Sequence, residues 1–65
     1  MKNYYEGKSS TGAVDFIITW DATEKEYLVD FFDSKNSDNE TAYIETLSYT
    51  TFHQALASAN SYSQF

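Results

Sequence analysis

The stretch VDFIITWDATEKEYLVDFF, residues 14–32, decides the fold of this chain. Two apolar runs, residues 14–20 and 27–32, are joined by the polar segment DATEKE, in which Asp21 is a typical turn-starting residue. Side chains alternate between the two faces of a strand, so each run places its larger apolar residues on one face. The sequence therefore predicts a β-hairpin. Its expected cross-strand pairs on the core face are Trp20 with Tyr27, Ile18 with Val29, and Phe16 with Phe31, with Val14 on the same face.

The opposite face of this hairpin has an unusual composition. It carries Asp15, Ile17 and Thr19 from the first strand and Leu28, Asp30 and Phe32 from the second. Ile17, Leu28 and Phe32 form an apolar stripe flanked by two carboxylates, and contiguous exposed apolar surface usually marks an interaction site. Two alternatives remain open. Tyr4 and Tyr5 fold over this face, or the register is displaced by one residue and this is the core face.

The segments on either side of the hairpin are less distinctive. Residues 1–12 are expected to be an N-terminal segment and loop, in which Tyr4-Tyr5 is a candidate edge strand or a cover for one end of the core. Residues 33–41 form a polar loop. Residues 42–47 are expected to be a third strand, with Tyr43 and Leu47 on one face and Ala42, Ile44 and Thr46 on the other.

A helix is predicted over residues 51–60. Thr51 followed three residues later by Gln54 is a capping-box pattern, and Asn60 is a plausible C-terminal stop. Apolar residues then recur at helical spacing, namely Phe52, Ala55, Leu56 and Ala59, and Tyr62 is a candidate extension of this stripe. One stripe of this width covers one face of a sheet.

The expected fold is a single α+β domain over residues 1–65, with the element order β-β-β-α. A small antiparallel sheet of three strands, or four if Tyr4-Tyr5 pairs, carries one C-terminal helix packed on one face. The residues expected beneath the helix are Val14, Phe16, Ile18, Trp20, Val29 and Phe31. The other face is then left open.

Length and composition limit how this fold is stabilised. A chain of 65 residues buries only about 60% of its unfolded surface, and without Cys it has no disulfide. Stability must therefore come from aromatic packing, since Phe, Tyr and Trp make up 18% of the chain, or from a second copy in a homodimer. The chain has no apolar run of membrane-spanning length and no signal-peptide pattern, so we expect a cytoplasmic protein.

The charge balance limits the choice of partners. Ten acidic residues oppose four Lys, and the formal net charge is −6. Nucleic acid and anionic membranes require cationic neutralisation, so neither is expected as a direct partner. The charge either keeps the chain soluble or presents an acidic face to a basic partner.

No catalytic or metal-binding motif is found. His53 is the only His, and no Ser lies in a nucleophile-elbow sequence. Asn36, Asp38 and Glu40 alternate as early EF-hand ligands do, but Thr41 and Leu47 stand where that loop requires Gly and Glu. We expect neither an enzyme, nor a metal site, nor a cofactor.

These observations favour a small acidic, non-catalytic binding protein that occupies the basic, nucleic-acid-binding groove of another protein. The strand and capped-helix ending resembles many small β-rich proteins, including short phage-encoded inhibitors of host enzymes, and this likeness extends to the fold alone. The alternative is a structural or assembly module that self-associates or docks on a larger subunit through its outer sheet face. The expected partner-binding residues are Asp15, Ile17, Leu28, Asp30, Phe32, Asp33, Asp38, Glu40, Tyr43 and Glu45.

Overall fold

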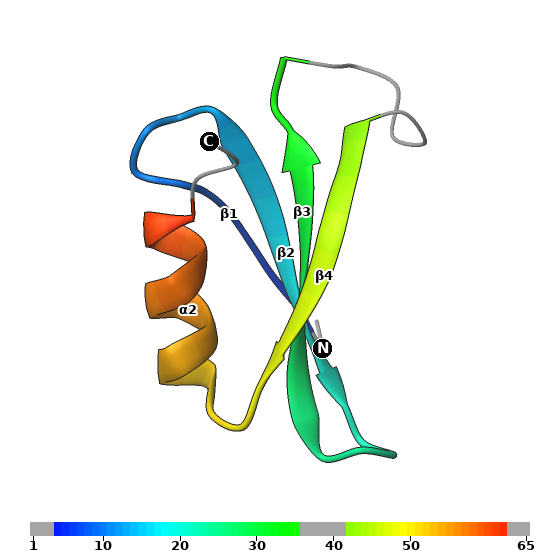
Figure 1. Ribbon diagram of the computed structural model, residues 1–65. Coiled ribbons are helices and arrows are strands. Elements are labelled where there is room, and N and C mark those ends of the chain that lie inside the picture. The colour runs from blue at the N-terminus through cyan, green and yellow to red at the C-terminus, as the bar shows by residue number, and fades with distance from the viewer. Residues whose placement is uncertain (1–3, 36–41, 63–65) are drawn as a thin grey trace.

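The computed structural model describes residues 4–35 and 42–62, and it is an α+β structure with one helix against a four-stranded antiparallel sheet (Figure 1). The strands β1 (Tyr4–Lys8), β2 (Val14–Asp21), β3 (Glu26–Asp33) and β4 (Tyr43–Tyr49) lie in the sheet in chain order. The helix α2 (Phe52–Ser61) packs against β2, β3 and β4 on one face. The predicted α+β class is confirmed. The sheet has four strands, because the segment that contains Tyr4 and Tyr5 pairs with β2.

The central hairpin has the register that residue alternation predicts. Phe16 pairs with Phe31, Ile18 with Val29, and Trp20 with Tyr27. At the turn, Asp21 Oδ1 accepts hydrogen bonds from the backbone N–H of Thr23, at 3.0 Å, and of Glu24, at 3.3 Å. The one-residue displacement is therefore excluded.

The core lies between this hairpin and the helix. Its side chains come from both central strands and from two positions one turn apart in α2, and each is at most 1% exposed: Val14, Phe16, Ile18, Val29, Phe31, Ala55 and Ala59. Because the helix contributes alanines at its closest approach, its backbone can lie near the bulky residues of the sheet. The large side chains of the core thus come from the sheet.

Trp20 is not covered by the helix, contrary to the prediction. It lies on the helix side and contacts Tyr27, with ring centroids 4.8 Å apart, but it is 43% exposed. Helix α2 has 10 residues against 8 in β2, and a helix rises about 1.5 Å per residue against about 3.3 Å for a strand. The helix is therefore too short to cover the whole face, and Trp20 lies beyond its first residue.

Strand β1 was expected to be mostly loop, but residues 4–8 pair along their length with β2. Tyr5 faces the helix side, where its ring stacks on Phe16 and contacts Phe52 edge-on. Tyr4 pairs with Thr19 on the opposite face. Tyr4 and Tyr5 therefore extend the sheet and do not fold over its outer face.

Strand β4 departs from simple alternation. Phe31 pairs with Glu45 and Phe32 with Tyr43, so Ile44 is an extra residue in β4, as in a β-bulge. The prediction that Tyr43 and Leu47 share a face is consequently wrong, because Leu47 packs on the core while Tyr43 lies opposite Phe32. The strand also continues to Tyr49, beyond the predicted end at residue 47.

The helix begins as its capping pattern predicts. Thr51 Oγ1 accepts a hydrogen bond from the Gln54 backbone N–H at 3.1 Å. The Gln54 side chain does not complete the reciprocal bond, since its Oε1 accepts from the Thr50 hydroxyl. At the other end, the helix continues one residue beyond Asn60, and Tyr62 extends the apolar stripe by stacking on Phe31 with ring centroids 3.8 Å apart.

Among the described residues there is no helix long and apolar enough to cross a membrane.

Gly7 should be essential to the packing of β1 on β2. A Cβ built at Gly7 would lie 2.6 Å from Phe16 Cζ, and the Phe16 ring is 1% exposed and cannot easily move away. We expect Gly7→Ala to lower the free energy of unfolding by about 0.5–2 kcal/mol, because an overpacking cost of about 1–3 kcal/mol is only partly offset by the roughly 0.5–1 kcal/mol that Ala gains over Gly in a strand. Urea denaturation measures the change.

The exposed neighbour variant Glu6→Ala serves as a control that should leave stability nearly unchanged. In a Phe16→Leu background, where the ring is absent, Gly7→Ala should cost little. An equal cost in both backgrounds would show that the ring contact is not the cause.

Candidate functional site

The candidate site is the sheet face opposite the helix, hereafter the outer face. Residues paired across antiparallel strands share a face, so the register defines three rows across the four strands. From β1 to β4 the rows are Tyr4, Thr19, Leu28 and Ser48; Glu6, Ile17, Asp30 and Thr46; and Lys8, Asp15, Phe32 and Tyr43. The pair of Asp21 and Glu26 continues the same alternation at the hairpin end.

The apolar part of the outer face lies on its two central strands. Ile17, Leu28 and Phe32 are each half-buried, and no described element covers them. Phe32 makes an edge-on contact with Tyr43, with ring centroids 5.8 Å apart, and Tyr43 is 48% exposed. Within residues 4–35 and 42–62, this apolar surface is therefore open to a partner.

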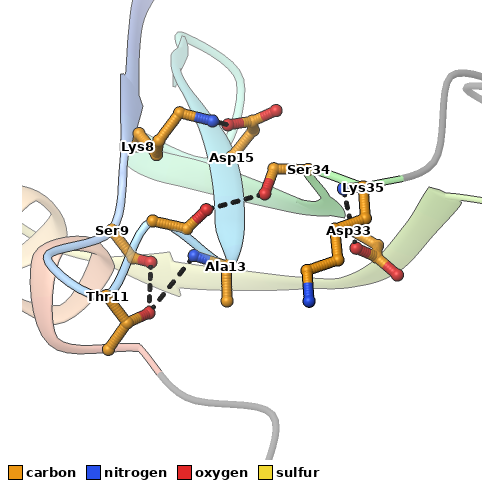
Figure 2. Close-up of polar contacts among 9 residues, drawn as sticks. Lys8, Ser9, Thr11, Ala13, Asp15, Asp33, Ser34 and Lys35 are labelled. Carbon is orange, nitrogen blue, oxygen red and sulfur yellow. Dashed lines mark hydrogen bonds and ion pairs between the residues drawn. The ribbon is translucent and has the colours of Figure 1, made fainter.

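Carboxylates surround this apolar surface. The outer face carries five acidic residues and one Lys: Glu6, Asp15, Asp21, Glu26, Asp30 and Lys8. Lys8 Nζ forms an ion pair with Asp15 Oδ1 at 2.6 Å, with both side chains about half exposed (Figure 2). The exposed pair contributes little to stability, but it partly neutralises Asp15.

Asp30 occupies a different environment. It pairs with Ile17 on one side and with Thr46 on the other, and its Oδ1 accepts a hydrogen bond from Thr46 Oγ1 at 2.5 Å. Thr46 Oγ1 is also 2.5 Å from the Tyr43 hydroxyl. The Asp30 carboxylate is thus held near the centre of the face, beside the apolar stripe.

One end of the outer face is hollowed. A cavity of about 640 Å³ is lined by residues that include Glu6, Lys8, Asp15, Phe32 and Asp33. The end of β3 is fixed there by Ser34, whose hydroxyl donates to the Gly12 carbonyl at 2.8 Å, while Asp33 Oδ1 accepts from the Lys35 backbone N–H at 2.9 Å (Figure 2). A partner side chain entering the hollow would meet more carboxylates than ammonium groups.

The structure brings together most, but not all, of the residues predicted to bind a partner. Asp15, Ile17, Leu28, Asp30, Phe32 and Tyr43 lie on one face, with Asp33 at the rim of the hollow. Asp38 and Glu40 lie outside the described residues. The outer-face residues that sequence reasoning missed come mainly from the two edge strands: Tyr4, Glu6, Lys8, Thr46 and Ser48.

Of the residues predicted to bind a partner, Glu45 lies away from this face, and so does its neighbour Ile44. The bulge turns Ile44 toward the core, against which it is partly buried. Glu45 lies beside the helix end, where its carboxylate accepts a hydrogen bond from the Tyr62 hydroxyl. Neither residue belongs to the outer rim, because the extra residue in β4 reverses the alternation that the prediction assumed.

No three acidic or His side chains in residues 4–35 and 42–62 are grouped so that they could hold a metal ion. Compared with known proteins, the chain matches no family model, and neither a curated protein nor a solved structure is significantly similar to it. The outer face is therefore the described feature that points to a function.

The contact between Tyr62 and Glu45 should make stability depend on pH in the alkaline range. The pKa of Tyr62 is raised from 10.0 to about 12, and burial is the largest cause. The hydrogen bond to Glu45 and the negative charge of Glu45 raise it further. The folded state retains the phenol proton after the unfolded chain has lost it, so this stabilisation is complete below pH 10 and is lost between pH 10 and about 12. We expect Tyr62→Phe to lose less stability than the wild type across this window.

Urea midpoints measured for both proteins at pH values on either side of pH 10 test this expectation. The remaining tyrosines and lysines titrate in both proteins, so the difference between the two reports Tyr62 alone. Parallel losses in the two proteins would mean that Tyr62 is not coupled to folding.

Proposed function

We propose that this chain is a small acidic, non-catalytic binding protein whose outer face docks into a basic groove of a partner protein that otherwise holds nucleic acid. The observation that carries the proposal is the uncovered outer face, where five carboxylates and one Lys surround Ile17, Leu28 and Phe32. The apolar stripe would contribute burial, and the carboxylates would occupy the positions at which cationic side chains of the partner bind phosphates.

Electrostatics support the choice of a basic partner. A net charge of −6 repels nucleic acid and attracts a cationic groove. This attraction mainly speeds association with the partner. By occupying the groove, the protein would exclude the nucleic acid and so act as an inhibitor, as some short phage-encoded proteins do. Partners of this kind are found in the cytoplasm, and the protein would act there. A chain without Cys forms no disulfide and so does not need an oxidising compartment.

Binding through this face should be sensitive to salt and to competing polyanions. The test begins by capturing partners from a lysate on the immobilised protein, and the affinity for a captured protein is then measured at low and high salt and with competing nucleic acid. We expect salt and nucleic acid both to weaken binding, because they screen or occupy the same cationic side chains. Affinity that is unaffected by either would contradict polyanion mimicry.

Matched charge variants locate the binding face. Asp30→Asn and Glu6→Gln each remove one outer-face charge and should weaken binding about two- to fivefold. Glu45→Gln removes the same charge on the helix side and should leave the affinity unchanged. If Glu45→Gln weakens binding as much as the other two, net charge matters and the outer face does not.

A second function is favoured by the apolar stripe itself. Uncovered Ile17, Leu28 and Phe32 are also suited to self-association or to docking on a larger subunit, as in an assembly module. In that case a homodimer would bury the stripe of each copy, and the acidic residues would only keep the free protein in solution.

Sedimentation separates this alternative from the first. If the stripe forms a homodimer, the wild type should sediment as a dimer and Phe32→Asp as a monomer, because a carboxylate would be buried in the interface. Ala57→Asp introduces the same charge on the exposed side of α2 and should remain dimeric. A wild type that stays monomeric at high concentration rules the homodimer out.

A further inference from the structure

A second surface lies at the end of the sheet where β1, β2 and β3 meet the first residue of the helix, mainly on the helix side. A cavity of about 340 Å³ opens there, lined by Tyr4, Tyr5, Ile18, Trp20, Tyr27 and Phe52. Five of these six residues are aromatic, and the lining has no cationic side chain. The volume lies within the range of about 300–1,000 Å³ that is usual for small-molecule sites.

The rings are inclined to one another and do not form a flat stack. Tyr5 and Phe52 meet at 83°, with centroids 5.6 Å apart, and Tyr27 and Phe52 meet at 71°, at 5.7 Å. Trp20 is tilted by 55° from Tyr27. Rings set at such angles present their faces and edges from several directions, as the walls of a cage do.

The cavity is also open to solvent. Tyr4 and Tyr5 are each 44% exposed, and Trp20 is 43% exposed. Exposing three large aromatic residues at one place is costly for a chain that buries so little surface overall. The arrangement is therefore suited to receiving a ligand against these rings.

The aromatic lining of the cavity selects the kind of ligand. None of the six lining residues is charged, the exposed turn beside the cavity carries the opposite charges of Glu24 and Lys25, and the chain as a whole has a net charge of −6. Aromatic faces attract organic cations through the negative charge of their π-systems, most strongly at Trp. An aromatic cavity of this kind, on a chain with a net charge of −6, is complementary to a positive charge that carries its own apolar groups.

We propose that this cavity binds the quaternary ammonium group of a small organic cation. The methyl groups of such a cation would contact the rings of Tyr5, Trp20 and Tyr27, while its charge would be attracted by the ring faces. This inference does not depend on the proposed function, because the cavity lies away from the centre of the outer face.

The test compares a cation with a neutral molecule of the same shape. Choline and 3,3-dimethylbutan-1-ol differ in having nitrogen or carbon at the branching atom, and Trp20 is the only Trp, so its fluorescence reports binding at this cavity. We expect choline to change the fluorescence saturably and the neutral analogue to bind about tenfold more weakly. Equal affinities would show that the cavity is merely apolar and would overturn the proposal. Failure of both compounds to bind would overturn it as well.

Variants then tie binding to the ring of Trp20. Trp20→Leu keeps an apolar side chain at a half-exposed position, and NMR amide shifts should show choline affinity reduced about tenfold. Tyr43→Leu changes an aromatic residue of similar exposure on the outer face and should bind choline as the wild type does. Unchanged affinity in Trp20→Leu would contradict the cage. If that variant does not fold, the comparison of choline with its neutral analogue in the wild type still decides.

Discussion

The packing of Ala55 and Ala59 of α2 on the sheet is the constraint on which the rest of the structure depends. These alanines are fully buried one helical turn apart, and the bulky core residues lie on the sheet side. Small side chains on the helix and large ones on the sheet fix the face on which the helix lies. Because residues 4–35 and 42–62 supply one apolar helix, the same contact leaves the outer face uncovered by them. The outer face and the aromatic cavity at the start of the helix are therefore both left exposed by the way in which α2 packs on the sheet.

The hairpin register could be predicted from sequence because alternation and side-chain size agree. Any one-residue displacement would bury Asp15 and Asp30 in place of Phe16 and Val29, so only one register is physically acceptable. Five of the ten predicted site residues lie on the outer face for this reason, and Tyr43 joins them through its pairing with Phe32. The function assigned to them was inferred from charge and exposure, and it remains a proposal.

Other features depend on interactions that local pattern does not show. Strand β1 contains Gly7, a poor strand former, and it is accommodated because the Phe16 ring fills the space above it. A Gly opposite a large aromatic residue is a signal that could have revealed the pairing, but only once the register of β2 was known. The bulge at Ile44 has no local signature and reversed the faces expected for Glu45 and Leu47. Trp20 was assigned to the core because apolar character alone does not reveal where a helix ends.

The sequential order of the strands has a consequence for how the chain folds. Every strand pairs with its neighbour in sequence, so each of the three pairings requires the closure of only a short or moderate loop. Proteins whose contacts are mostly local in sequence fold faster than those that join distant segments. One backbone hydrogen bond, from Ser10 N–H to the Asn60 carbonyl at 2.9 Å, joins the first loop to the end of the helix. Because this bond joins segments far apart in the chain, we expect it to form late in folding.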